Sequence, residues 1–189
     1  MKIILASKSS RRSYLLKKLI KDFTIIDSKF DESLIKNKKP KEYCQKIAIS
    51  KAQSVAQKNA DSIVIAADTI VSIKNNILEK PSSYNEAFKM LKLLSGSTHF
   101  VHTGVSIIYP FNKSNVNFTE TTKVKFVNLR DKDIKQYIDS NKPYDKAGSY
   151  GIQDPEFIFV DYIEGNYENV IGLPISKIYK ILLELKVIK

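Results

Sequence analysis

Two adjacent arginines, Arg11 and Arg12, are the clearest candidates for a chemical role. The chain holds 31 Lys and Arg residues, yet arginine occurs only at these positions and at Arg130. The pair follows a short apolar run and two serines, in ILASKSSRR (4–12). A guanidinium offers forked donors that match phosphate oxygens, which a lysine ammonium cannot do in the same geometry. The pair indicates either a phosphate site or an ordinary surface pair beside a helix start.

Two acids are candidates for holding a metal ion or activating water. Asp68 comes at the end of an apolar, β-branched strand predicted at 62–68, and Glu32 lies in the loop after a strand predicted at 23–27. An acid at a strand end is either a cap for the next turn or a metal ligand or base. Hard cations bind carboxylate oxygens together with substrate phosphates, so a phosphate site nearby would give both acids a function.

Three other features have plainer interpretations. The segment KPYDKAGSYGIQ (142–153) is either a long turn between a helix and a strand or backbone that approaches a ligand closely. His99 and His102, three apart on a predicted strand, should point to opposite faces and are poor zinc ligands. Cys44, without a CxxC pattern, is expected to be a buried small apolar group.

The elements that must position these residues follow from periodicity and caps. Residues 2–6 predict a buried strand, and a helix should run from Ser9 or Ser10 as its N-cap to about Ile20, with Tyr14 in the core. The first turn of such a helix presents free N–H groups and a positive dipole end, which bind anions. This segment has no glycine and is not a Walker loop.

The remaining elements predict the fold class. Further helices are expected at 39–59, from Ser83 to Gly96, at 131–140 and from Pro174; strands are expected at 99–109, 116–127 and 156–165, with a hairpin about Asn75 and Asn76. Helices and strands intermix without strict alternation. We therefore expect one domain, residues 1–189, of the α/β class with α+β character: a mixed, twisted sheet flanked by helices.

Composition limits the classes of partner. The net charge of +11 indicates either an anionic partner or a lysine-coated surface, and the even spread of lysines favours the second. There is no nucleic-acid-binding motif, no signal-peptide core and no apolar stretch of about 20 residues. Because the chain has a single cysteine and no signal-peptide core, it is expected to be cytoplasmic. Because it has no binding motif and no long apolar stretch, it is expected to bind neither nucleic acid nor membrane. The sequence leaves a homodimer open.

Taken in order, these segments resemble the Maf family of nucleoside triphosphate pyrophosphatases over essentially the whole chain. That family opens with a strand followed by S-x-S-P-R-R. The matching segments here are SKSSRR (7–12), SKA (50–52), ADT (67–69), EKP (79–81), LSGSTH (94–99), DKAGSYGIQ (145–153) and VIGLP (170–174). Two segments depart from the family pattern: Ser10 stands where the family has proline, and QDPEFIFV (153–160) lacks the usual glycines after the glutamine.

The resemblance implies an activity. It is the hydrolysis of a nucleoside triphosphate, dTTP or UTP for the branch this chain is similar to, into the monophosphate and pyrophosphate with Mg²⁺ or Mn²⁺. The family is also associated with non-canonical nucleotides and with restraint of septum formation, so a non-enzymatic regulator acting through a protein partner is the alternative.

The resemblance also implies a Maf/ITPase-like nucleotide-binding cleft and its residues. Asp68 would be catalytic and would share a metal with Glu32. Thr69 and Gln153 would set base specificity. The remaining residues implied to bind substrate are Ser7, Arg11, Arg12, Lys51 and Lys80.

Overall fold

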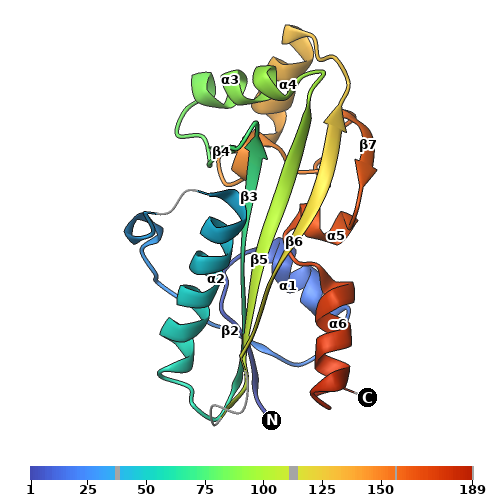
Figure 1. Ribbon diagram of the computed structural model, residues 1–189. Coiled ribbons are helices and arrows are strands. Elements are labelled where there is room, and N and C mark those ends of the chain that lie inside the picture. The colour runs from blue at the N-terminus through green and yellow to red at the C-terminus, as the bar shows by residue number, and fades with distance from the viewer. Residues whose placement is uncertain (37–38, 111–114, 156, 189) are drawn as a thin grey trace.

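The computed structural model describes all residues except 37–38, 111–114, 156 and 189. Its described strands form one sheet in the order β2-β1-β3-β5-β6-β7, with β4 paired to β3 (Figure 1). The long strands β3 (Ile63–Ile73), β5 (Thr98–Ile108) and β6 (Asn115–Phe126) are antiparallel and run most of the length of the molecule. The strands β1 (Ile3–Leu5) and β2 (Thr24–Ile25) add in parallel on one side, and β7 (Val160–Glu164) adds antiparallel on the other.

The two faces of the sheet are covered differently, because side chains alternate along each strand. Val64 and Ala66 of β3 pack with Ala52 and Val55 of the helix α2 (Pro40–Ala56). On the opposite face, one buried cluster joins the sheet to α1 (Ser10–Lys17) and α6 (Ile175–Glu184). A second cluster on that face joins the sheet to α3 (Tyr84–Leu94) and α4 (Asp131–Asn141), at the other end of the molecule (Figure 1). The short helix α5 (Tyr167–Ile171) precedes α6.

Several helix ends follow from local capping residues. Ser9 is the N-cap of α1 and accepts a hydrogen bond from the N–H of Arg12 at 3.4 Å. Ser10 is the first residue of that helix, so α1 begins without the proline of the family pattern. Ser83 caps α3, and Gly96 follows its end with φ +62°. As predicted, Cys44 is buried, and His99 and His102 contact different sides of the sheet.

Other expectations were wrong. The strand predicted at 62–68 does not end at the acid: β3 continues to Ile73, and its hairpin turn falls at Lys74 and Asn75. Tyr14 is 56% exposed instead of packing in the core. The strands predicted at 23–27 and 156–165 shorten to Thr24–Ile25 and Val160–Glu164, and residue 156 lies outside the described residues.

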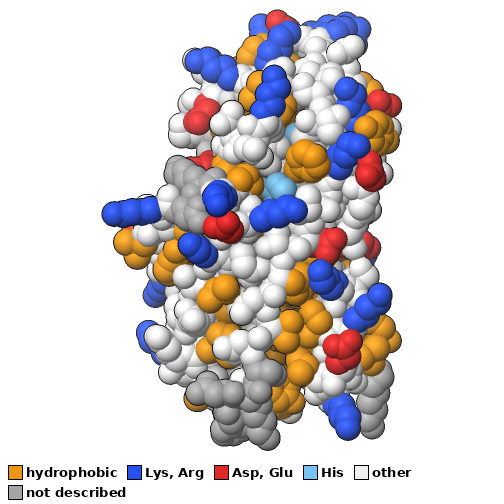
Figure 2. All heavy atoms as spheres, in the orientation of Figure 1, with side chains coloured by type: hydrophobic (Ala, Val, Ile, Leu, Met, Phe, Trp, Pro, Cys, Tyr) orange, Lys and Arg blue, Asp and Glu red, His pale blue; other side chains and the backbone are white. Residues whose placement is uncertain are grey.

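On one face of the molecule (Figure 2), charge is spread as the sequence predicted. On the face that Figure 2 shows, lysine and arginine side chains are scattered among polar and apolar ones and form no continuous basic area. Among the described residues, no helix has the length and apolar character required to cross a bilayer.

Candidate functional site

A cavity of about 470 Å³ opens where the sheet is interrupted beside β3. The strand β1 pairs with Ile63–Ile65, and β4 (Asn76–Leu78) pairs with Val71–Ile73. The stretch of β3 between them, which includes Asp68 and Thr69, is paired with β5 and lines the cavity on its other edge. All nine residues that the resemblance singled out line this one cavity: Ser7, Arg11, Arg12, Glu32, Lys51, Asp68, Thr69, Lys80 and Gln153.

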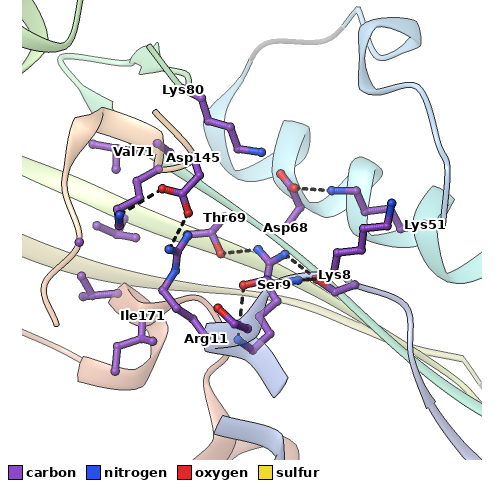
Figure 3. A pocket seen from close by; sticks show the side chains of 18 of the residues that line it. Lys8, Ser9, Arg11, Lys51, Asp68, Thr69, Val71, Lys80, Asp145 and Ile171 are labelled. Atoms are coloured by element: carbon purple, nitrogen blue, oxygen red, sulfur yellow. Dashed lines mark hydrogen bonds and ion pairs between the residues drawn. The ribbon is translucent and has the colours of Figure 1, made fainter. Parts of the chain in front are cut away.

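Asp68 is a buried carboxylate held by a lysine from α2. Its Oδ1 atom lies 2.8 Å from Lys51 Nζ (Figure 3). The same Nζ lies 2.6 Å from Oε1 of Glu32. Glu32 begins a 3-10 turn, Glu32–Leu34, after β2. Burial raises the pKa of the Asp68 carboxyl, although Lys51 and Arg12 act to lower it. A carboxylate of this kind is a better proton acceptor than an exposed aspartate.

Asp68 and Thr69 reach the cavity from opposite faces of β3. Asp68 lies on the α2 face, whereas Thr69 lies on the face of α1 and α5. Side chains from both faces can share one cavity because the edge of β3 is open there to both sides. The sequence expectation of a strand ending at the acid missed this arrangement, which depends on pairing with β5.

Arg12 is anchored at each of its guanidinium nitrogens. It donates to the carbonyl of Gly172 (Nε, 2.9 Å), to Ser7 Oγ (Nη1, 3.3 Å) and to Thr69 Oγ1 (Nη2, 3.0 Å). Each terminal nitrogen has a second hydrogen available for a ligand. Arg12 therefore joins β1, β3 and the turn before α6, and it presents its remaining donors to the cavity.

The contact between Arg12 and Thr69 continues into a buried hydrogen-bonded chain. Thr69 and Thr103 hydroxyl oxygens lie 3.0 Å apart, and Thr103 donates to the carbonyl of Asn169 at 3.1 Å. Because Thr103 donates onward, the Thr69 hydroxyl can donate to Thr103 while accepting from Arg12. The hydroxyl of Thr69 thus fixes the guanidinium, and the side chain lines the cavity.

Arg11 reaches across the cavity to a residue without an assigned role in the sequence interpretation. Its Nη1 lies 2.9 Å from Oδ2 of Asp145 (Figure 3). The other carboxylate oxygen of Asp145, Oδ1, lies 3.1 Å from Lys146 Nζ. Burial acts to raise the pKa of Asp145, but the hydrogen bonds from Arg11 and Lys146 outweigh it and lower the pKa. From the sequence, Asp145 and Lys146 were identified only as part of the segment 142–153. At the mouth, Lys8 and Asp27 form a further ion pair of 2.9 Å.

The cavity has a charged end and an apolar end. Lys80 points toward the charged end in Figure 3. The apolar end, which includes side chains from both clusters of that sheet face, is lined by Val71, Val101, Ala147, Tyr150, Ile152, Val170 and Ile171. Gln153 lies at the rim beside Ile152. This division suits a ligand with a polyanionic part and a flat, less polar part.

The carboxylates fit a divalent cation that a phosphate ligand helps to bind. Among the described residues, no group of three or more His, Cys, Asp or Glu side chains could hold a metal ion unaided. Glu32 and Asp68, however, meet at the same Lys51 ammonium. Mg²⁺ is typically held by one or two carboxylates plus substrate phosphates, and this pair matches that donor set.

Known proteins are similar to this chain along nearly its whole length. A dTTP/UTP pyrophosphatase of Thermosipho africanus is 50% identical over 182 residues, covering 96% of this chain and 92% of that protein. One from Clostridium perfringens is 47% identical over 184 residues, covering 96% of each. A solved HAM1 protein from Coxiella burnetii shares the fold at 17% identity, with a TM-score of 0.54 over 97% of this chain and 99% of that one.

The family comparison includes both the serine-arginine turn that begins α1 and the Gly172 turn before α6. The model for the family described as Maf-like protein matches residues 2–185. Because this match spans nearly the whole chain and the two relatives are 50% and 47% identical to it, this chain belongs to the Maf-like protein family.

Proposed function

We propose that residues 1–189 form one cytoplasmic catalytic domain that hydrolyses dTTP and UTP to the monophosphate and pyrophosphate. The relatives' names support the substrates. The observation that carries the proposal is the buried Asp68 carboxylate, held by Lys51 at the charged end of a cavity whose other end is apolar. No contact among the described residues favours a non-enzymatic regulator of septum formation instead.

The charged end binds the triphosphate. Arg11 presents its fork once phosphate oxygens displace Asp145, while Arg12 adds its free donors without leaving Ser7, Thr69 and Gly172. Lys51 and Lys80 offset the remaining charge. Fixed cations of this kind stabilise a phosphoryl-type transition state mainly by position and charge.

The reaction breaks the bond between the α phosphorus and the oxygen that bridges it to the β phosphorus. A water oxygen bonds to the α phosphorus, its proton passes to the Asp68 carboxylate, and the electron pair of the broken bond leaves on pyrophosphate. The raised pKa of Asp68 suits this proton transfer. Glu32 and Asp68 would hold Mg²⁺ or Mn²⁺, which when bound supplies further charge neutralisation.

The apolar end takes the base, and Gln153 reads its edge. A glutamine amide offers one donor group and one acceptor, which match the carbonyl and N–H edge of uracil or thymine. A site sized for one ring rejects purines, and an unpaired amide facing cytosine costs roughly 1–3 kcal/mol. We expect at least about tenfold preference for UTP over CTP and over ATP in kcat/KM.

The test measures pyrophosphate release from UTP, dTTP, CTP, ATP and GTP, with Mg²⁺, with Mn²⁺ and with neither. Asp68→Asn should lower kcat by about 10²-fold or more, because the replacement keeps the shape but cannot accept the proton. Asp22→Asn, at an exposed position outside the cavity, is the matched control. More than a tenth of the wild-type rate in Asp68→Asn would rule out the role of Asp68.

A further inference from the structure

Gln153 sits on a tight turn and its position depends on that turn. The N–H of Asp154 donates to the carbonyl of Gly151 at 2.9 Å, which places Ile152 and Gln153 at the centre of the turn. Gln153 is exposed at the cavity rim, and within the part of the chain that the structure describes its amide makes no hydrogen bond. Whatever fixes the turn therefore fixes the point from which the Gln153 side chain reaches the cavity.

The hydroxyl of Tyr137 forms hydrogen bonds with both ends of this turn. The N–H of Gly151 donates to Tyr137 Oη at 2.9 Å, and Tyr137 in turn donates to Oδ2 of Asp154 at 2.6 Å. One hydroxyl thus ties the first and last residues of the turn to each other. Tyr137 is itself buried on α4, against Phe157 and Phe159, so the turn is attached to a rigid helix.

Asp154 completes the attachment through charge and shape. Its carboxylate lies 3.4 Å from Lys146 Nζ, and the two side chains are only 16% and 11% exposed. It also packs so closely on Gly151 that a Cβ there would come within 2.6 Å of Oδ1. Asp154 lies directly after Gln153, in the segment where this chain departs from the glycine-containing family pattern.

We propose that Asp154 is a positioning residue that sets base selectivity by holding Gln153 through Tyr137 and Lys146. The inference rests on the proposed role of Gln153. An amide selects a base only when it is held within about 0.5 Å and 10–20° of the productive geometry. Without the Asp154 carboxylate the turn keeps the hydrogen bond from Gly151 to Tyr137 but loses the one from Tyr137 to Asp154 and the ion pair with Lys146. The turn that carries Gln153 is then held less firmly, so the amide distinguishes uracil from cytosine less well.

The effect should appear in selectivity, not in the chemical step. Among the described residues, Asp154 makes no direct contact with the groups proposed to bind the triphosphate; it is connected to Arg11 only through Lys146 and Asp145. In Asp154→Ala we expect the preference for UTP over CTP in kcat/KM to fall by about fivefold to tenfold, with kcat on UTP within about twofold of wild type. Tyr137→Phe should act in the same direction, and Asp154→Asn, which keeps an acceptor for Tyr137, should lose less.

The experiment measures kcat and KM for UTP and CTP in these variants, in Gln153→Ala and in the double variant Asp154→Ala with Gln153→Ala. If Asp154 acts through Gln153, the Asp154 substitution has no further effect on selectivity once Gln153 is alanine. Asp161→Ala, an exposed acid on β7, is the control and should leave the preference unchanged. Thermal unfolding of each variant reports its folding.

Three outcomes overturn the inference. Should Asp154→Ala keep the full preference while Gln153→Ala loses it, Asp154 has no positioning role and the proposed function stands. Equal losses from Asp154→Ala with and without Gln153 would show that Asp154 acts by another route. If Gln153→Ala itself keeps the preference, the base-reading role fails and the inference fails with it. Should Asp154→Ala not fold, Tyr137→Phe and Asp154→Asn decide by the same readout.

Discussion

Arg11 and Arg12 are neighbours in the sequence but hold different kinds of partner. Arg12 binds neutral oxygens of Ser7, Thr69 and Gly172, which a phosphate does not need to displace. Arg11 is paired with the carboxylate of Asp145, so a substrate must exchange one anion for another. The charge of Arg11 is neutralised both when it pairs with Asp145 and when it pairs with phosphate. What the phosphates gain from Arg11 is therefore the geometry of its paired N–H donors.

The exchange predicts a large effect from a conservative replacement. Arg11→Lys keeps the charge but loses the fork, so kcat/KM for UTP should fall by about tenfold or more. Steady-state pyrophosphate release measures this. Arg130→Lys, which alters an exposed arginine paired with Asp133 on α4, should leave kcat/KM unchanged. Wild-type activity in Arg11→Lys would show that the fork is not used.

At the scale of elements, the site depends on how closely α2 lies against the sheet. Gly104 of β5 is paired with Asp68 of β3, and a Cβ at Gly104 would lie 2.5 Å from the carbonyl oxygen of Cys44 on α2. The helix backbone therefore touches the sheet directly at this point. The same helix carries Lys51, so the contact at Gly104 sets the separation between Lys51 and Asp68.

Gly104→Ala should push α2 away from the sheet. We expect a loss of about 1–3 kcal/mol in the free energy of unfolding, and a fall in kcat because Lys51 moves with the helix. Urea unfolding and pyrophosphate release measure the two effects. Asn117→Ala, at an exposed position of β6, should change neither. A stable, fully active Gly104→Ala variant would contradict the close contact.

The elements with local signals were predictable from the sequence. The caps Ser9 and Ser83 and the glycine after α3 act within a few residues of the ends they set. The continuation of β3 past Asp68 was not predictable in this way, because an acidic residue after an apolar run usually indicates that the strand ends there. Asp68 is tolerated in mid-strand since Lys51, 17 residues away, compensates its charge.

The candidate site was predictable as a set of residues but not as a set of contacts. Family motifs identified nine of the residues that line the cavity. The pairing of Arg11 with Asp145 spans 134 residues, and the clamp of Asp154 by Tyr137 spans 17. A single sequence contains no periodicity or cap that reports such distant pairs, so Asp145 and Asp154 were missed as partners.

At the scale of the whole molecule, the central strand β5 buries two neutral imidazoles. His99 lies against Phe126 and Tyr150, and His102 lies between Ser72 and Thr121. Burial lowers the pKa of each to about 4, with Lys41 adding to the effect at His102. In the unfolded chain both would titrate near 6.5, so the unfolded state binds more protons between these values.

Stability should therefore fall in mild acid. The contribution of the neutral imidazoles is fully present above pH 6.5 and is lost as the pH falls toward 4, by up to about 3 kcal/mol for each histidine. Urea unfolding across this range measures the loss. His102→Gln, which cannot titrate, should show a shallower fall than wild type. Equal slopes in the two proteins would contradict the assignment.

The anchoring of Arg12 makes the completed cavity depend on a residue that is synthesised long after the arginine itself. Its acceptors lie 5, 57 and 160 residues away in the chain, at Ser7, Thr69 and Gly172. A nascent chain still short of Gly172 holds both arginines and Asp68 but lacks the carbonyl that fixes the guanidinium. The anchored guanidinium of the finished cavity therefore cannot form during synthesis before Gly172 has been made.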